Sequence, residues 1–122
     1  FQNWLELDSE VFGGDYKGHY GSGIITQIKV APEAAQHPIL KGFKPYETPS
    51  KLYKNPRLAN DTNVLLTGSI PDHTEPLAWT REHRGGRVFY TSLGEPADFE
   101  KESFRRILVN AIFWAVENKS SK

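Results

Sequence analysis

The stretch RVFYTSLGEPADF, from Arg87 to Phe99, carries the clearest fold signal in the chain. Its first part, Val88 to Leu93, is apolar or small on both faces, which is typical of a strand covered from two sides in a parallel sheet. A Gly-Glu-Pro corner follows and leads toward a helix. Because the carboxyl ends of parallel strands face the ligand crevice, the stretch predicts an α/β fold with a functional position at Glu95.

The next segment, from about Glu102 to Asn118, is expected to be a helix with more than one apolar face. One stripe is suited to a core, and a second contains Val109, Phe113 and Val116. Such a helix needs cover on two sides, and the strands visible in the sequence supply only one. We therefore expect a neighbour to cover the second side. The alternative is a C-terminal helix that is merely more apolar than usual.

Upstream of this stretch, apolar periodicity and turn residues predict the remaining elements. Arg84-Gly85-Gly86 indicates a tight turn, so the strands on either side of it are expected to form a hairpin. The expected elements are an amphipathic helix at Gln2–Phe12, strands at Ile24–Ala31, Val64–Ile70 and Pro76–His83, and a short helical turn at His37–Lys41.

Composition narrows the functional classes. The length of 122 residues suggests one domain, and 15 Lys plus Arg balance 15 Asp plus Glu. A neutral chain gives no general reason to expect nucleic acid or an anionic membrane as a partner. The absence of cysteine excludes disulfides, thiolate metal sites and a cysteine nucleophile within this chain. No apolar run approaches the roughly 18–20 residues that span a membrane, and the compartment is left open.

Several blocks carry a family resemblance: EVFGGDYKGHYG, HPILKGF, LYKN and EPLAWTREHRGGRVFYTSLGEPADFEKESFRRILVNAIFWA. The chain resembles the ThuA-like family, named for trehalose utilisation, over nearly its whole length. The resemblance implies a three-layer α/β fold like that of the class I glutamine amidotransferases (flavodoxin-like), with residues 1–122 as its C-terminal portion. It also implies that an N-terminal half of the domain, or another chain, is a partner. The opening without methionine agrees with that expectation.

The resemblance implies a role in carbohydrate metabolism. On this basis the chain is expected to be an enzyme or enzyme subunit acting on a sugar or keto-sugar derivative. The alternative is a non-catalytic carbohydrate-binding or assembly module. A glutamine amidotransferase proper is disfavoured because the chain has no cysteine. The cofactor is not determined, and a divalent metal is left open.

Two residues are the best catalytic candidates. His19 lies in a glycine-rich loop and is suited to act as general base or metal ligand, or else bonds its own turn. Asp15 is the nearest carboxylate, either a partner of His19 in substrate binding or a solvated acid. Glu95 stands where many family sequences have histidine, and Ser50 and Lys51 stand where many have Asp-Glu. These departures weaken the transfer of a metal site, although His19 and Glu95 are expected to approach one crevice.

Aromatic residues are candidates for sugar contacts, because their faces stack on the C–H surfaces of sugars. Tyr53 is the preferred candidate for substrate binding. Trp79 and Tyr90 lie in predicted strands, so packing in the core is the favoured interpretation for both. His37 precedes Pro38 in the His-Pro pair of the family and is interpreted as a capping or packing residue rather than a functional one.

Overall fold

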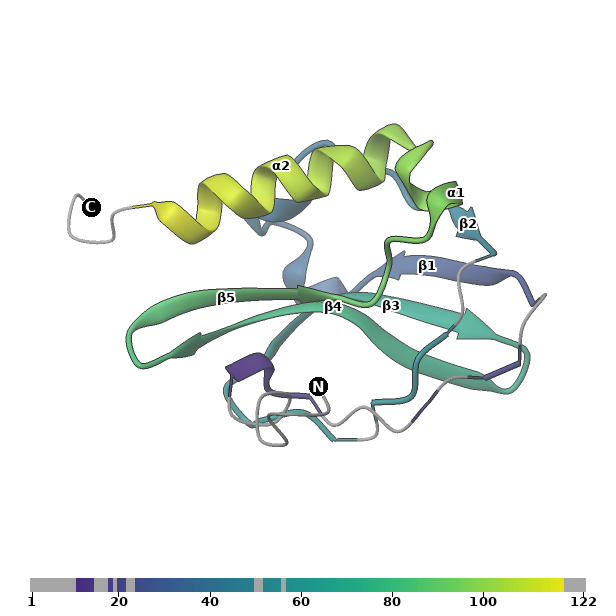
Figure 1. Cartoon of the computed structure of the whole chain (residues 1–122), viewed down its shortest axis with the longest axis horizontal. Coiled ribbons are helices and arrows are strands. Elements are labelled where there is room, and N and C mark those ends of the chain that lie inside the picture. Colours follow the sequence, from purple (N-terminus) through teal and green to yellow (C-terminus); the bar gives the residue numbers. More distant parts are fainter. Residues whose placement is uncertain are drawn as a thin grey trace.

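The computed structural model describes residues 11–14, 18, 20–21, 24–49, 52–55 and 57–117. They form a curled antiparallel sheet with one long helix lying along one face and loops along the other (Figure 1). The strand order is β2-β1-β3-β4-β5. The strands are β1 (Thr26–Val30), β2 (Glu47–Thr48), β3 (Asn63–Ile70), β4 (His73–His83) and β5 (Gly86–Thr91). The helical elements are η2 (Pro32–Ala34), η3 (Pro38–Leu40), α1 (Pro96–Phe99) and α2 (Glu102–Val116).

The α/β class is confirmed, but the expected parallel pairing of the strand after Arg87 is wrong. β5 pairs antiparallel with β4, from Ala78↔Thr91 to His83↔Gly86. The reason is the two-residue turn between them, in which Arg84 (φ 51°) and Gly85 (φ 82°) both have positive φ. Turns of this kind match the twist of a hairpin. All strand pairs among the described residues are antiparallel, so these residues do not by themselves form a flavodoxin-like sheet.

Two-sided cover of β5 explains why its sequence resembles a parallel strand. Phe89 packs against the core beneath α2. Tyr90 points to the opposite face, where its ring lies 5.6 Å from the Phe12 ring and 4.2 Å from the Trp79 indole. Trp79 is fully buried, which confirms that it packs in the interior. β5 therefore has apolar residues on both faces because both faces are covered, and not because a parallel strand lies beside it.

The core lies between α2 and the sheet. Phe104, Ile107 and Ala111 repeat on one face of α2 and are all at least 95% buried. Complete burial of such a side chain contributes about 1.5–3 kcal/mol for the larger residues. The second apolar stripe predicted from the sequence is exposed in the described structure. Its residues Val109, Phe113 and Val116, together with Ile112, which was expected on the core stripe, have exposed fractions of 51–74%.

The corner between β5 and α2 is fixed by Asp98. Its side chain is completely buried and accepts hydrogen bonds from Thr48 Oγ1 (2.6 Å) and Tyr46 Oη (3.2 Å). It also accepts the backbone N–H groups of Gly94 (2.9 Å) and Glu95 (3.2 Å). Burial, and then the negative charge of Asp98, raise the pKa of Tyr46 far above its ordinary value. One carboxylate therefore joins the Gly-Glu-Pro corner to the β2 region.

Some elements differ from the sequence-based expectation. β4 begins at His73, three residues before the predicted start, because Pro71 and Asp72 make a tight turn that brings it directly against β3. β2 was not expected. Of the helix predicted at Gln2–Phe12, only Val11 and Phe12 lie among the described residues. No helix in the described part of the chain is long and apolar enough to cross a membrane.

Candidate functional site

Of the four site residues predicted from the sequence, the structure describes two, Glu95 and Tyr53. His19 and Asp15 lie outside the described residues. Glu95 is exposed and occupies the N-cap position of α1, where Asp98 holds its backbone N–H. The approach of His19 to Glu95 in one crevice stays a prediction.

Tyr53 lies in a segment that pairs with the glycine-rich loop. The Tyr20 amide donates to the Leu52 carbonyl (2.9 Å), and the Lys54 amide donates to the Gly18 carbonyl (2.7 Å). Tyr53 itself is half-buried between these two bonds. The proposed sugar contact of Tyr53 is not tested by this geometry, but its backbone is held in place on both sides.

A polar cluster next to this segment anchors the loop. Tyr20 Oη donates to Glu75 Oε2 (2.9 Å), and this bond is the main cause that raises the pKa of Tyr20. The Tyr20 ring stacks on His73 at 4.4 Å, and Lys54 Nζ lies 4.6 Å from the ring centre. Glu75 Oε1 also accepts the Asn55 amide at 2.9 Å. Tyr20, Glu75, His73 and Lys54 are thus each used in a mutual contact, which favours a structural role for their side chains.

A concave surface lies elsewhere, at the end of the sheet near the β4–β5 hairpin. Two cavities of about 350 and 340 Å³ adjoin there and share His37 and Asn63. We call this combined feature the His37 groove. Its lining residues are Glu33, Ala34, Gln36, His37, Asp61, Thr62, Asn63, Val64, Leu65, Thr80, Arg81, Glu82 and Trp114.

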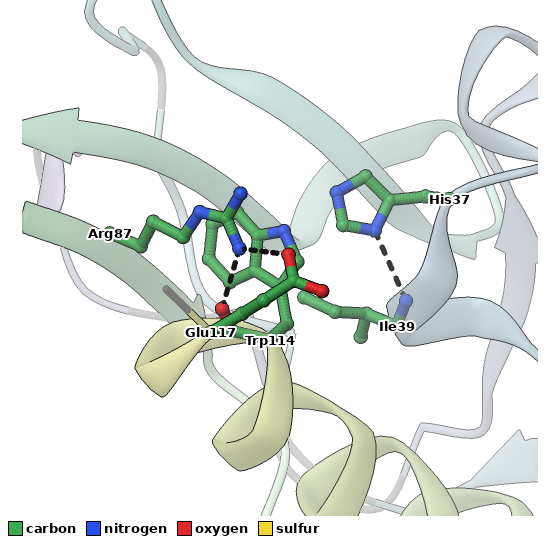
Figure 2. A network of polar contacts seen from close by, with 5 residues as sticks. All are labelled: His37, Ile39, Arg87, Trp114 and Glu117. Carbon is green, nitrogen blue, oxygen red and sulfur yellow. Dashed lines mark hydrogen bonds and ion pairs between the residues drawn. The ribbon is translucent and has the colours of Figure 1, made fainter. Parts of the chain in front are cut away.

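His37 is held between the two short helical turns η2 and η3. It is the N-cap of η3, and its Nδ1 accepts the Ile39 amide at 3.1 Å, while its Nε2 points away from that amide (Figure 2). Burial, and then the positive charge of Arg87, lower the pKa of His37. A neutral imidazole whose Nδ1 is an acceptor carries its proton on Nε2. The capping role predicted from the sequence is confirmed, and His37 is also a hydrogen-bond donor available at the groove.

Trp114 forms an aromatic wall fixed by Arg87. The guanidinium of Arg87 lies 4.8 Å from the Trp114 ring, and its Nη1 donates to the Trp114 carbonyl (2.7 Å) and to Glu117 Oε1 (2.9 Å) (Figure 2). These bonds satisfy a backbone acceptor in the last turn of α2. The Trp114 and His37 rings lie 5.5 Å apart. The wall is therefore rigidly placed beside the His37 donor.

The remaining wall of the groove is polar. Arg81 Nη2 forms an ion pair with Asp61 Oδ2 at 3.3 Å, and the exposed Asn63 adds a side-chain amide. Carboxylates, an amide and N–H donors beside an aromatic ring suit a ligand rich in hydroxyl groups. Among the described residues, no cluster of three or more His, Cys, Asp or Glu side chains is arranged to hold a metal ion.

Few signals in the sequence predict this groove. Its residues come from the η2–η3 connection, the start of β3, the end of β4 and the last turn of α2. Two local signals did exist. Proline directly after His37 is typical of the first position of a helical turn, and Trp114 falls between the two apolar stripes of its helix. Neither signal predicts that Asp61, Asn63 and Glu82 lie nearby.

Comparison with known proteins identifies the class to which this fold and groove belong. The family model described as ThuA, trehalose utilisation, matches residues 2–115. The chain therefore belongs to the ThuA family, whose description implies a carbohydrate-related role. No curated protein matches the chain, and no solved structure does so. The glutamine amidotransferase-like fold of the complete domain accordingly remains an implication of the family resemblance.

Acidification is expected to weaken the fold through His37. Its folded-state pKa lies below the unfolded value of 6.5, so the unfolded chain binds the proton more readily. The contribution of the neutral ring is present above about pH 6.5 and is lost as the pH falls through the folded-state pKa. Protonation also removes the acceptor for the Ile39 amide. The pH dependence of the free energy of unfolding is measured by urea unfolding of the wild type and His37→Asn between about pH 8 and about pH 5. A pH dependence identical in both proteins would contradict it.

Proposed function

We propose that the protein binds a sugar or keto-sugar derivative in the His37 groove and that the complete protein acts on it as an enzyme or enzyme subunit. The ThuA family membership supports a carbohydrate ligand. The observation that carries the proposal is the neutral His37 ring at the wall shared by the two cavities, with Nδ1 engaged by Ile39 and Nε2–H left as a donor. A hydroxyl or carbonyl oxygen of a sugar is the acceptor that fits it.

This geometry assigns His37 the role of donor rather than base. A fixed, neutral imidazole N–H stabilises negative charge that develops on a carbonyl oxygen, which suits a keto-sugar. It does not abstract a proton, because the lone pair of Nδ1 is already used by the Ile39 amide. Proton transfer therefore requires another residue, and Glu82 and Asp61 are the carboxylates that line the same groove as His37.

The catalytic roles predicted for His19 and Glu95 remain proposals. They would place a second site, separate from the His37 groove, around Glu95. Glu95 precedes α1, at the opposite end of α2 from Trp114 (Figure 1). A helix of 15 residues is about 22 Å long. Glu95 is accordingly not among the residues that line the His37 groove. If Glu95 takes part in turnover, the residues predicted to act with it at that second site are Asp15, His19 and Tyr53.

A non-catalytic carbohydrate-binding or assembly module is the second candidate. The exposed stripe of Val109, Ile112, Phe113 and Val116 on α2 favours it. Four large apolar residues on one helix face are suited to contact another protein surface. We propose that the N-terminal half of the family domain, or another chain, covers this stripe. Urea unfolding together with light scattering of wild type and Phe113→Glu in the complete protein tests this, and identical stability and association of both proteins would contradict it.

Sugar binding is tested by titrating the full chain with trehalose and with an oxidised keto-disaccharide. We expect amide resonances around His37 and Asn63 to shift in NMR spectra. His37→Asn keeps an acceptor for the Ile39 amide, since asparagine caps helices well, but it removes the Nε2 donor. One neutral hydrogen bond contributes about 0.5–1.5 kcal/mol, so binding should weaken by roughly 2- to 13-fold.

His73→Asn is the matched control for this experiment. His73 stacks on Tyr20 in the polar cluster and does not line the groove. We expect this variant to bind sugar like the wild type. If neither sugar shifts any resonance of the groove, or if both histidine variants weaken binding equally, the groove is not the sugar site.

A further inference from the structure

We infer that the His37 groove selects uncharged sugars and discriminates against their phosphorylated forms. The inference rests on the proposed function and names the substrate class of that same site. It is carried by the charges that line the groove and by the way in which the nearby guanidinium groups are already used.

The lining of the groove is negatively charged. The lining includes three carboxylates, those of Glu33, Asp61 and Glu82, and one guanidinium, that of Arg81, so the lining residues carry a net charge of −2. His37 adds no compensating positive charge near neutral pH, because burial and Arg87 lower its pKa. A phosphate monoester carries a charge of about −1.5 to −2 at neutral pH. Bringing it into this groove therefore places like charges together.

The two guanidinium groups near the groove are engaged with protein acceptors. Arg81 is paired with Asp61 at 3.3 Å. Arg87 donates to the Trp114 carbonyl and to Glu117 Oε1, and its guanidinium lies over the Trp114 ring. Arginine recognises phosphate best through two parallel N–H donors. A bidentate phosphate contact that used Nη1 of Arg87 or Nη2 of Arg81 would have to compete with these existing bonds.

A neutral sugar can bind in the groove without displacing Arg81 or Arg87 from its protein partners. Its hydroxyl groups donate to the carboxylates of Asp61 and Glu82, accept from His37 Nε2, and leave the Arg81–Asp61 and Arg87–Glu117 pairs intact. The acidic lining thus favours one form of the ligand by its hydrogen bonds and opposes the other by its charge. The discrimination is electrostatic, so it should decrease as salt screens the charges.

Calorimetric titration of the full chain with trehalose and with trehalose 6-phosphate tests the inference. At low salt we expect the phosphorylated sugar to bind at least about tenfold more weakly, a ratio that shrinks as ionic strength rises to about 0.5 M. Glu82→Lys should lower the ratio by at least about threefold, since it replaces a negative charge of the groove by a positive one. Glu82→Gln should fall between Glu82→Lys and the wild type.

Glu100→Lys is the matched control, because Glu100 is exposed and lies after α1, away from the groove. It changes the net charge of the chain as much as Glu82→Lys does, and it should leave the ratio unaltered. If trehalose binds and its phosphate binds as tightly or more tightly, the inference is overturned while the proposed function stands. If neither binds, both are overturned. An equal effect of Glu100→Lys and Glu82→Lys would also overturn it, since the lining charges would then not be responsible.

Discussion

Replacing Asp98 by alanine is expected to destabilise the folded chain by at least about 3 kcal/mol. The carboxylate is completely buried and accepts four hydrogen bonds. Alanine removes all four acceptor contacts at once. The Thr48 hydroxyl and the Gly94 and Glu95 amides then lose this acceptor, and the Thr48 hydroxyl belongs to a buried residue with little access to water. Burying such groups without a hydrogen bond costs more than the bond itself contributes.

Two further variants separate the hydrogen bonds from the loss of volume. Asp98→Asn keeps the shape but offers one acceptor oxygen instead of two, so it should lie between alanine and the wild type. Thr48→Val removes only the 2.6 Å bond from Oγ1 and should have the smallest effect. Urea unfolding with linear extrapolation gives the three free energies. If Asp98→Ala unfolds within about 1 kcal/mol of the wild type, the corner is not held by this carboxylate.

The strands and the long helix follow from local patterns in the sequence. Ile24, Thr26, Ile28 and Val30 alternate along the sequence and share one face, which predicts β1, and its bounds of Thr26–Val30 lie inside the predicted range. The helix predicted from Glu102 is α2, with its core stripe buried, whereas the cover predicted for its second stripe stays a prediction. These elements are predictable because burial on one face imposes a period that the sequence records directly.

The direction of β5 was not predictable in the same way. A strand with apolar side chains on both faces indicates cover on both sides, but it does not identify what provides the cover. Here one side is covered by α2 and the other by contacts of Tyr90 with Phe12 and Trp79. The turn at Arg84-Gly85 was the informative signal. It favoured a hairpin with β4, and it should have outweighed the pattern of the strand.

The groove was even less predictable, because no motif contains it. His37 and Trp114 lie 77 positions apart in the sequence and meet only when α2 packs over the sheet. Asp61 and Glu82 join them because the register of β3 with β4 pairs Asn63 with Thr80. A single sequence gives the residue types that a sugar site needs, but their juxtaposition depends on helix placement and strand register together.

Replacing Trp79 by alanine is expected to destabilise the chain by about 3–5 kcal/mol without selectively weakening sugar binding. Trp79 is fully buried, its Nε1–H donates to the Phe12 carbonyl at 2.6 Å, and its indole stacks on Tyr90 at 4.2 Å. It also fills the space next to Gly14, where an added Cβ would lie only 2.8 Å from the indole. Alanine leaves a large cavity, which the segment around Gly14 and the sheet can close only in part.

Comparison with Trp114 separates a core tryptophan from one that contributes to the groove. Trp79→Phe retains a ring for stacking on Tyr90 but loses the Nε1 donor, so we expect a smaller loss of stability and unchanged sugar affinity. Trp114→Ala removes a half-buried ring that lines the groove, so we expect a smaller loss of stability than for Trp79→Ala and a clear loss of sugar affinity. Unfolding free energies and trehalose titrations of the three variants provide the comparison. If Trp79→Phe weakens binding as much as Trp114→Ala does, the ligand contacts the loop face of the sheet, and the site has been placed on the wrong side of β4.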